Sequence, residues 1–287
     1  MRLDGCYINL DRSHDRRRLM DAQLSGLGLA GLIRRLPAID GLTGGPFDSR
    51  VKNGTWGCRR SHETAIGDAP PDSATVVLED DVEISPHFPS IIQPDTIGHF
   101  VTHSPDVDIA FLDCCIYWNS APVLLAKTES RMAHRAAADL DGHDRHQLVT
   151  VDVIDARDVY AYCAAAYLVT PAGKQTLRKL FAAAQDPATP VDTLFNGWIH
   201  SGELNARIFV PFLATPRLAA ESTIGSEADS SVIDPNECFW AGVFRRIVFA
   251  GNPALDLARV EQVLGAARAS SEYRLGMRVY EHFRSMT

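Results

Sequence analysis

Three consecutive acids, Glu79, Asp80 and Asp81, are the residues of this chain best suited to chemistry. They follow the apolar run 74–78, whose β-branched residues predict a buried strand. In open α/β sheets, ligands bind at the carboxyl ends of such strands. Because adjacent carboxylates repel one another, a hard divalent cation such as magnesium, calcium or manganese would stabilise them, and that cation could also hold a diphosphate. Acids that cap a turn or face water would give the same pattern, so both interpretations stand.

A cluster of arginines, Arg12 and 16–18, lies near the N-terminus. It falls at the start of a helix predicted over residues 13–27, with Ser13 as the N-cap and Met20 and Leu24 on the apolar face. The helix dipole disfavours cations at this end, which hints that an anion binds nearby. A solvated surface is the alternative for at least two of these arginines.

His62 and the cysteines are candidates for chemistry that have simpler explanations. A second helix is predicted to open at residues 55–57, and His62 lies among small residues on its face. We favour a hydrogen-bonded core histidine over a catalytic one. The six cysteines form no C-x-x-C pair and four lie in apolar surroundings, so free thiols are expected and zinc ligation is not.

Strand-like and helix-like segments alternate along the chain, which predicts an α/β fold. Further strands are expected at 6–10, 33–36, 107–112, 149–154, 160–169 and 207–213, the third of these six ending at Asp113. Helices are expected to start at Thr170-Pro171 and Pro190, and two more at 256–269 and 272–285. Segments 86–94 and 221–234 read as irregular or polar, and 119–145 reads as a loop or a partly helical excursion. The predicted organisation is one α/β domain over 1–235 with a helical appendage, 236–287, packed on it.

Composition excludes several classes of protein. With 287 residues, 46% hydrophobic and 22% charged, the chain is globular rather than disordered. A formal net charge of -8 argues against a nucleic-acid-binding surface. No apolar run approaches the roughly 20 residues that cross a bilayer, and no signal-peptide core follows Met1, so a cytoplasmic location without a transmembrane segment is expected.

Several motifs in a fixed order resemble those of glycosyltransferase family 25, which includes lipooligosaccharide and collagen galactosyltransferases. The resemblance spans roughly residues 5 to 235 and rests on the blocks Tyr7-Ile8-Asn9-Leu10-Asp11-Arg12-Ser13, Asp15-Arg16-Arg17, Pro37-Ala38-Ile39-Asp40-Gly41, Gly57-Cys58 with Ser61-His62, Leu78-Glu79-Asp80-Asp81, Ala166-Tyr167-Leu168-Val169-Thr170 and Pro190-Val191-Asp192.

The resemblance implies a GT-A nucleotide-binding fold with a helical C-terminal appendage, and a nucleotide-sugar donor, most often UDP-galactose, used with manganese. It assigns Glu79 and Asp81 to the metal and Asp80 to the ribose or to a supporting contact. It also implies that the donor lies against one group of residues: Asn9, Leu10, Arg12, Arg17, Ala38, Asp40, Gly41, Ser61 and His62. The acceptor would be a saccharide, a lipid-linked saccharide or a protein; a lipid-linked one would bring the enzyme to the inner face of the membrane.

The named family members invert the anomeric centre, which requires a base for the acceptor hydroxyl. Asp192, within a matched motif at a helix start, is the first candidate, although an N-cap is an equal explanation. Asp113 is the competing base or sugar ligand. The rival functions are a metal-dependent nucleotide-sugar hydrolase and an inactive nucleotide-sugar-binding protein. No G-x-G-x-x-G follows a strand, so a nicotinamide enzyme is not supported.

Overall fold

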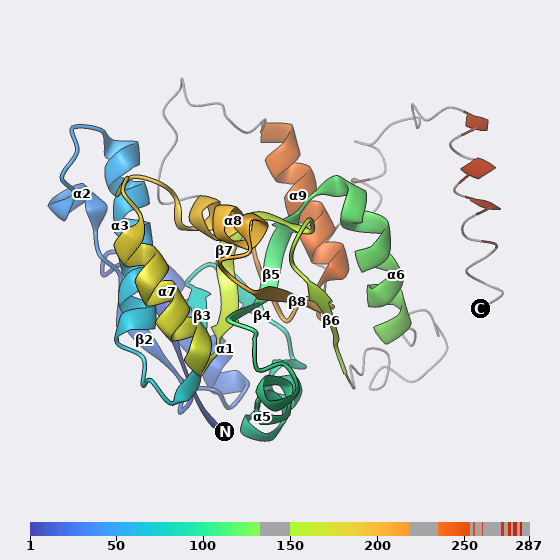
Figure 1. Ribbon diagram of the computed structural model, residues 1–287, viewed down its shortest axis with the longest axis horizontal. Coiled ribbons are helices and arrows are strands. Elements are labelled where there is room, and N and C mark those ends of the chain that lie inside the picture. The colour runs from blue at the N-terminus through green and yellow to red at the C-terminus, as the bar shows by residue number, and fades with distance from the viewer. Residues whose placement is uncertain are drawn as a thin grey trace. The chain divides into compact units, whose positions relative to one another are not determined.

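The computed structural model describes residues 1–132, 150–217 and 235–252, with isolated positions between 255 and 282 (Figure 1). The chain divides into two compact units, Met1–Pro253 and Ala254–Thr287. All the helices and strands named below belong to the first unit, which is an α/β assembly built on a mixed central sheet, as the sequence predicts.

Within the described residues, strands form two sheets: β1 (Arg2–Asn9), β2 (Ile33–Pro37), β3 (Ser73–Glu79), β4 (Val82–Ile84), β5 (Ile109–Ile116), β6 (Asp152–Asp155), β7 (Tyr160–Val169), β8 (Ala206–Val210) and β9 (Ala214–Pro216). The central sheet has seven strands in the order β2-β1-β3-β7-β5-β8-β6. β1 runs parallel to β2 and β3, and β5 parallel to β8, whereas β7 is antiparallel to both of its neighbours and β6 to β8. β4 and β9 form the second sheet, antiparallel to each other.

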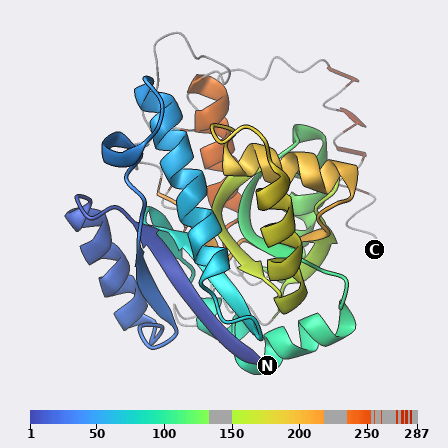
Figure 2. The ribbon, with the colours of Figure 1, turned by 60° about the vertical axis from the view of Figure 1, so that its left-hand side comes forward.

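Helices cover both faces of the central sheet: α1 (His14–Gly26), α2 (Gly41–Gly44), α3 (Arg50–Gly67), α4 (Phe88–Ile91), α5 (Pro94–His103), α6 (Ala121–Arg131), α7 (Pro171–Ala183), α8 (Val191–Ser201) and α9 (Pro235–Val248), with a 3-10 turn at Trp118–Ser120. One core lies under α3, α7 and α8 and includes Leu177 and Phe195. The other lies under α1, α4 and α5 and includes Met20 and Ile97. In Figure 2, β1 passes between α1 and α3. None of the helices that the structure describes has the length and apolar character needed to span a bilayer.

The parallel pairing of β1 with β3 brings their carboxyl ends to one edge of the sheet. Ile8 is the register partner of Glu79, the last residue of β3. The predicted strand 74–78 is confirmed, because Ser73 to Leu78 are all buried within β3. Consequently the segment that leaves β1 and the acidic turn that leaves β3 lie beside each other.

Local capping explains where the site-bearing helices begin. Ser13 is the N-cap of α1 as predicted, although its hydroxyl makes no capping bond. Thr170 caps α7, its Oγ1 accepting a 2.9 Å hydrogen bond from the Gly173 amide. α3 begins at Arg50, before the predicted start at residue 55, because Ser49 accepts from the Lys52 amide.

Two further sequence expectations about element boundaries were wrong. β5 does not end near Asp113 but continues to Ile116, so Asp113 lies inside the strand with its side chain fully buried. The segment 86–94, expected to be irregular, contains the helical turn α4. The segment that begins at residue 119 contains α6, which agrees with the partly helical alternative. The sequence analysis also missed α9, which begins at Pro235.

Other expectations fall outside the described residues. The polar segment 221–234, residues 133–145 of the segment 119–145 and most of the two predicted C-terminal helices are of this kind. The boundary of the first compact unit lies at Pro253 rather than at 235, because α9 packs against β5 and belongs with that unit.

Candidate functional site

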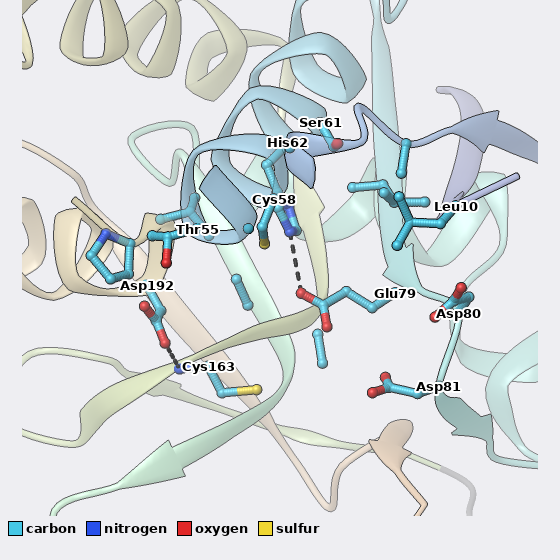
Figure 3. A pocket seen from close by; sticks show the side chains of 18 of the residues that line it. Leu10, Thr55, Cys58, Ser61, His62, Glu79, Asp80, Asp81, Cys163 and Asp192 are labelled. Atoms are coloured by element: carbon cyan, nitrogen blue, oxygen red, sulfur yellow. Dashed lines mark hydrogen bonds and ion pairs between the residues drawn. The ribbon is translucent and has the colours of Figure 1, made fainter. Parts of the chain in front are cut away.

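A cavity of about 960 Å³ opens at the carboxyl ends of β1 and β3. Its walls come from the segment after β1, residues 38–42, α3, the acidic turn 79–81, residues 161–165 of β7 and the start of α8. Figure 3 shows Asp80 and Asp81 at one side of this cavity and Asp192 at the opposite side, with Cys58 and His62 descending from α3 between them.

Most of the site residues predicted from the sequence line this cavity: Leu10, Arg12, Ala38, Asp40, Gly41, Ser61, His62, Glu79, Asp80, Asp81 and Asp192. Asn9, Arg17 and Asp113 are not among the lining residues. Arg16, an alternative to Arg12 and Arg17 in the sequence-based prediction of a diphosphate contact, also lines the cavity, as do Cys163 and Arg245, which were not predicted.

The acidic turn contains more negative charge than its neighbours neutralise. Asp80 is buried, accepting from Asn9 Nδ2 at 2.7 Å and from Arg16 Nη1 at 2.9 Å. Arg16 Nη1 also lies 3.7 Å from Asp81 Oδ2. The other oxygen of Asp81, Oδ1, is buried without a hydrogen-bond partner. A buried carboxylate oxygen with no partner is costly, so this atom is suited to an incoming cation or donor.

The pKa values of the acids express this imbalance. Burial, reinforced by the charge of Glu79, raises the pKa of Asp81 to about 7 against the opposing charge of Arg16. Burial also acts to raise the pKa of Glu79, but the hydrogen bond with His62 and the charges of Arg245 and Arg16 outweigh it, so that pKa is lowered. The turn therefore holds a stable carboxylate at Glu79 and one at Asp81 that the surrounding acids destabilise.

His62 is a buried, hydrogen-bonded histidine, as the sequence analysis favoured, but it also reaches the cavity. Its Nδ1 lies 2.8 Å from the hydroxyl of Tyr167, and its Nε2 lies 3.3 Å from Glu79 Oε1 (Figure 3). The ring is 1% exposed, so its orientation is fixed by these two contacts. His62 thereby positions Glu79 at the end of β3.

The arginines of the N-terminal cluster have separate partners. Arg12 forms an ion pair with Asp40, the N-cap of α2, and both line the cavity. Arg17 instead turns to Asp21 at 3.6 Å, one helical turn along α1, and is half exposed. Thus Arg12 and Arg16 supply positive charge to the cavity, whereas Arg17 does not.

The wall formed by residues 38–42 is fixed to α3 through Ser61 and two glycines. Ser61 Oγ accepts a 2.8 Å hydrogen bond from the Ile39 amide and donates to the Gly57 carbonyl. A Cβ on Gly57 would lie 2.6 Å from the Ile39 carbonyl oxygen, and one on Gly41 would lie 1.7 Å from the Asn53 carbonyl oxygen. Only glycine allows this close approach, so Ser61 shapes the cavity wall rather than contacting its contents.

Asp192 lies in the first turn of α8 and faces the cavity, but it is not the N-cap, which is Pro190. Its Oδ2 accepts a 3.1 Å hydrogen bond from the amide of Cys163. Cys163 has a φ of 82°, a conformation rare for a residue with a side chain, at an irregular part of the β5–β7 pairing. Such strain is typical of functional sites.

Asp113 does not reach the cavity, because Arg245 covers it. Both its oxygens accept hydrogen bonds from Arg245, one of them at 3.0 Å from Nε. Arg245 Nη2 also lies 3.1 Å from Cys163 Sγ. Arg245 comes from α9, and the apolar spacing of Ala241, Phe244 and Val248 is the sequence signal that could have revealed this helix.

The residues at the acidic turn fit a divalent cation. The unpartnered Asp81 Oδ1 and the partly exposed carboxylate of Glu79 offer the hard oxygen ligands that magnesium and manganese prefer. Asp80 is already bonded to Asn9 and Arg16, and it is better suited to hold the turn than to coordinate the ion.

No protein-family model matches the chain, and no curated protein matches it in sequence.

Proposed function

We propose that this protein is a metal-dependent glycosyltransferase of GT-A type that moves a hexose from a nucleotide diphosphate to an acceptor hydroxyl. The observation that carries the proposal is the unpartnered, buried oxygen of Asp81 in a turn of three acids at the carboxyl end of β3. That turn opens into a cavity of about 960 Å³, a volume sufficient for a small organic ligand. The motif resemblance supports UDP-galactose as the donor and manganese as the ion.

Two groups of residues would bind the donor. Glu79 and Asp81 would hold the cation that, when bound, stabilises the diphosphate leaving group electrostatically. Arg12 and Arg16 face the same cavity, and their guanidinium groups would hydrogen-bond phosphate oxygens. Leu10, Ala38, Asp40 and Gly41 would form the wall against the nucleoside, with Asp40 accepting from the base or ribose.

Asp192 is the proposed base. It lies across the cavity from Asp80 and Asp81 (Figure 3), on the side from which an acceptor hydroxyl would approach in an inverting reaction. The amide of Cys163 donates a hydrogen bond to its Oδ2 and so orients the carboxylate in the first turn of α8. Asp192 would accept the proton of that hydroxyl as the oxygen attacks the anomeric carbon. The acceptor class proposed is a saccharide, free or lipid-linked.

Isothermal titration with a panel of UDP-, GDP- and CMP-sugars, with and without Mn²⁺, tests the proposal. We expect one UDP-sugar to bind in a metal-dependent manner. Asp81→Asn should lose that binding, whereas the control Asp95→Asn, at an exposed position on α5 outside the cavity, should keep it.

Turnover separates the proposed transferase from its rivals. Release of UDP that requires a saccharide acceptor supports the transferase, and Asp192→Asn should abolish that release while donor binding persists. Release at the same rate without an acceptor would indicate a hydrolase. Binding without turnover for any acceptor tested would indicate a nucleotide-sugar-binding protein, and absence of nucleotide-sugar binding under all conditions would contradict the proposal entirely.

A further inference from the structure

A second set of metal-binding atoms lies in the cavity, on its α3 side. The thiol of Cys58, the imidazole of His62 and the carboxylate of Glu79 bring one sulfur, one nitrogen and one oxygen within 4.8 Å of one another. Cys58 and His62 are four residues apart on α3 and therefore share a face of that helix, while Glu79 ends β3. The three residues come from two elements that the core holds together.

The separation of two of these donor atoms matches a tetrahedral metal centre. His62 Nε2 and Glu79 Oε1 lie 3.3 Å apart. In a tetrahedral zinc site with bonds of the usual length, the nitrogen and oxygen ligands lie about 3.3 Å apart and the sulfur and nitrogen ligands about 3.6 Å apart. Because no pair in this set exceeds 4.8 Å, rotation of the Cys58 side chain would bring its sulfur into range.

The surroundings of His62 resemble those of a metal-ligating histidine. A histidine that binds a metal through one ring nitrogen usually has its other nitrogen held by a hydrogen bond. In this structure the hydroxyl of Tyr167 lies 2.8 Å from Nδ1, which leaves Nε2 directed at Glu79. All three side chains line the cavity, so a fourth coordination position would face its interior.

The donor set selects the kind of ion. Thiolate and imidazole ligands favour zinc, whereas the carboxylates of the acidic turn favour magnesium or manganese. The other thiols near the cavity, Cys115 and Cys163, are poorly suited to a cation because the guanidinium of Arg245 lies 3.1 Å from Cys163 Sγ. A search of the sequence for C-x-x-C pairs overlooks Cys58, because its partners are a histidine one helical turn away and a glutamate on another element.

We propose that Cys58, His62 and Glu79 form a zinc-binding site whose fourth coordination position is open to the cavity. Binding exchanges the proton of the Cys58 thiol, which leaves to solvent, for the zinc ion. Glu79 belongs to this site and to the acidic turn, so zinc competes there with the cation expected at Asp81. The site does not depend on sugar transfer, because its ligands would bind zinc whatever the cavity's substrate.

Titration of the purified full chain with Co²⁺ tests the site. We expect one equivalent to give a thiolate-to-cobalt charge-transfer band in the near ultraviolet, which Zn²⁺ then displaces. Cys58→Ser should lose this band. Cys163→Ser, which removes another thiol lining the same cavity, should keep it, as should Asp81→Asn, which tests the acidic turn separately. Absence of the band, or its persistence in Cys58→Ser, overturns the proposal.

A measurement on the unmodified chain guards against misfolding of the variants. Zinc at about ten times its Kd should slow alkylation of Cys58 by iodoacetamide about tenfold, while Cys163 reacts at an unchanged rate; peptide mass spectrometry measures both. Equal protection of the two thiols, or protection of neither, contradicts the proposed site. If the chain binds zinc at this site but binds no nucleotide sugar, only the proposed function is refuted. If it binds a nucleotide sugar but no zinc at this site, only the zinc site is refuted.

Discussion

Asp81 and Asp113 are two aspartates largely removed from solvent, and they differ in what neutralises them. Asp113, inside β5, is fully buried and has both oxygens bonded to Arg245. Asp81, after β3, shares Arg16 with Asp80 and has one oxygen without a partner. Burial alone therefore does not distinguish the two aspartates: at β5 the chain supplies the counter-ion of the buried carboxylate, whereas after β3 one carboxylate oxygen has no partner among the described residues.

Breaking the ion pair between Asp113 and Arg245 should have the largest effect on stability. Asp113→Asn leaves Arg245, whose side chain is only 11% exposed, without its carboxylate, and we expect the free energy of unfolding to fall by about 3–5 kcal/mol. Urea unfolding followed by circular dichroism measures this. The double variant Asp113→Asn with Arg245→Met should recover most of the loss, and Asp81→Asn should cause none. An equal loss in Asp81→Asn would remove the distinction between the two aspartates.

The pH dependence of stability should come from Asp81. The pKa of Asp81 in the folded state, about 7, lies above its usual value of 3.8, so the folded state binds this proton more tightly than the unfolded state. That contribution is present in full below about pH 4 and is lost as the pH rises through about 7. In EDTA, Asp81→Asn should remove this loss, changing the pH 4 to pH 8 difference in the free energy of unfolding by roughly 4 kcal/mol. If the free energy of unfolding varied with pH in the same way for Asp81→Asn and the unmodified chain, the expectation would be contradicted.

Manganese should have a smaller, selective effect. At pH 8 and free Mn²⁺ about ten times its Kd, the unmodified chain should gain about 1.4 kcal/mol. The gain should shrink at pH 5, where Asp81 is protonated, and vanish in Asp81→Asn. Differential scanning fluorimetry measures the shift, with Asp95→Asn as the matched control. The same gain in Asp81→Asn would indicate that manganese binds elsewhere.

The smallest effect on stability is expected for Arg12→Gln. Arg12 is 44% exposed in its pair with Asp40, and such pairs contribute less than about 1 kcal/mol. Its loss should nevertheless weaken UDP binding about tenfold, because one charge-assisted hydrogen bond to the diphosphate disappears. Arg18→Gln, an exposed arginine paired with Asp15 outside the cavity, should change neither quantity. Equal weakening in both variants would mean that only overall charge matters.

The acidic turn could be found from the sequence because its signal is local. The strand and the three acids that end it are contiguous, and the parallel neighbour β1 follows from the α/β rhythm. The position of His62 on a buried helical face was predictable for the same reason.

The environment of Asp113 could not be found in this way, because its partner is 132 residues further along the chain. A charged residue after an apolar run reads as the end of a strand, and only the arrival of Arg245 from α9 allows β5 to continue through it. The unusual backbone of Cys163 is equally invisible in sequence, since it arises where the β5–β7 register shifts. The local sequence pattern predicts the helices and strands. Pairing between residues far apart in the sequence decides which acidic side chains remain accessible to a ligand.

The close approach of Gly41 and Gly57 has a consequence for how this chain can evolve. The backbones of segment 38–42 and α3 are in contact there, since a Cβ added to Gly57 would lie only 2.6 Å from the Ile39 carbonyl oxygen. Segment 38–42 and α3 are therefore expected to move together as a rigid unit. A change of ligand size cannot be accommodated by sliding that wall, so new specificities must arise on the facing side, at α8 and β7. In a saturation library Gly57, which does not line the cavity, should be as intolerant of replacement as Gly41, which does.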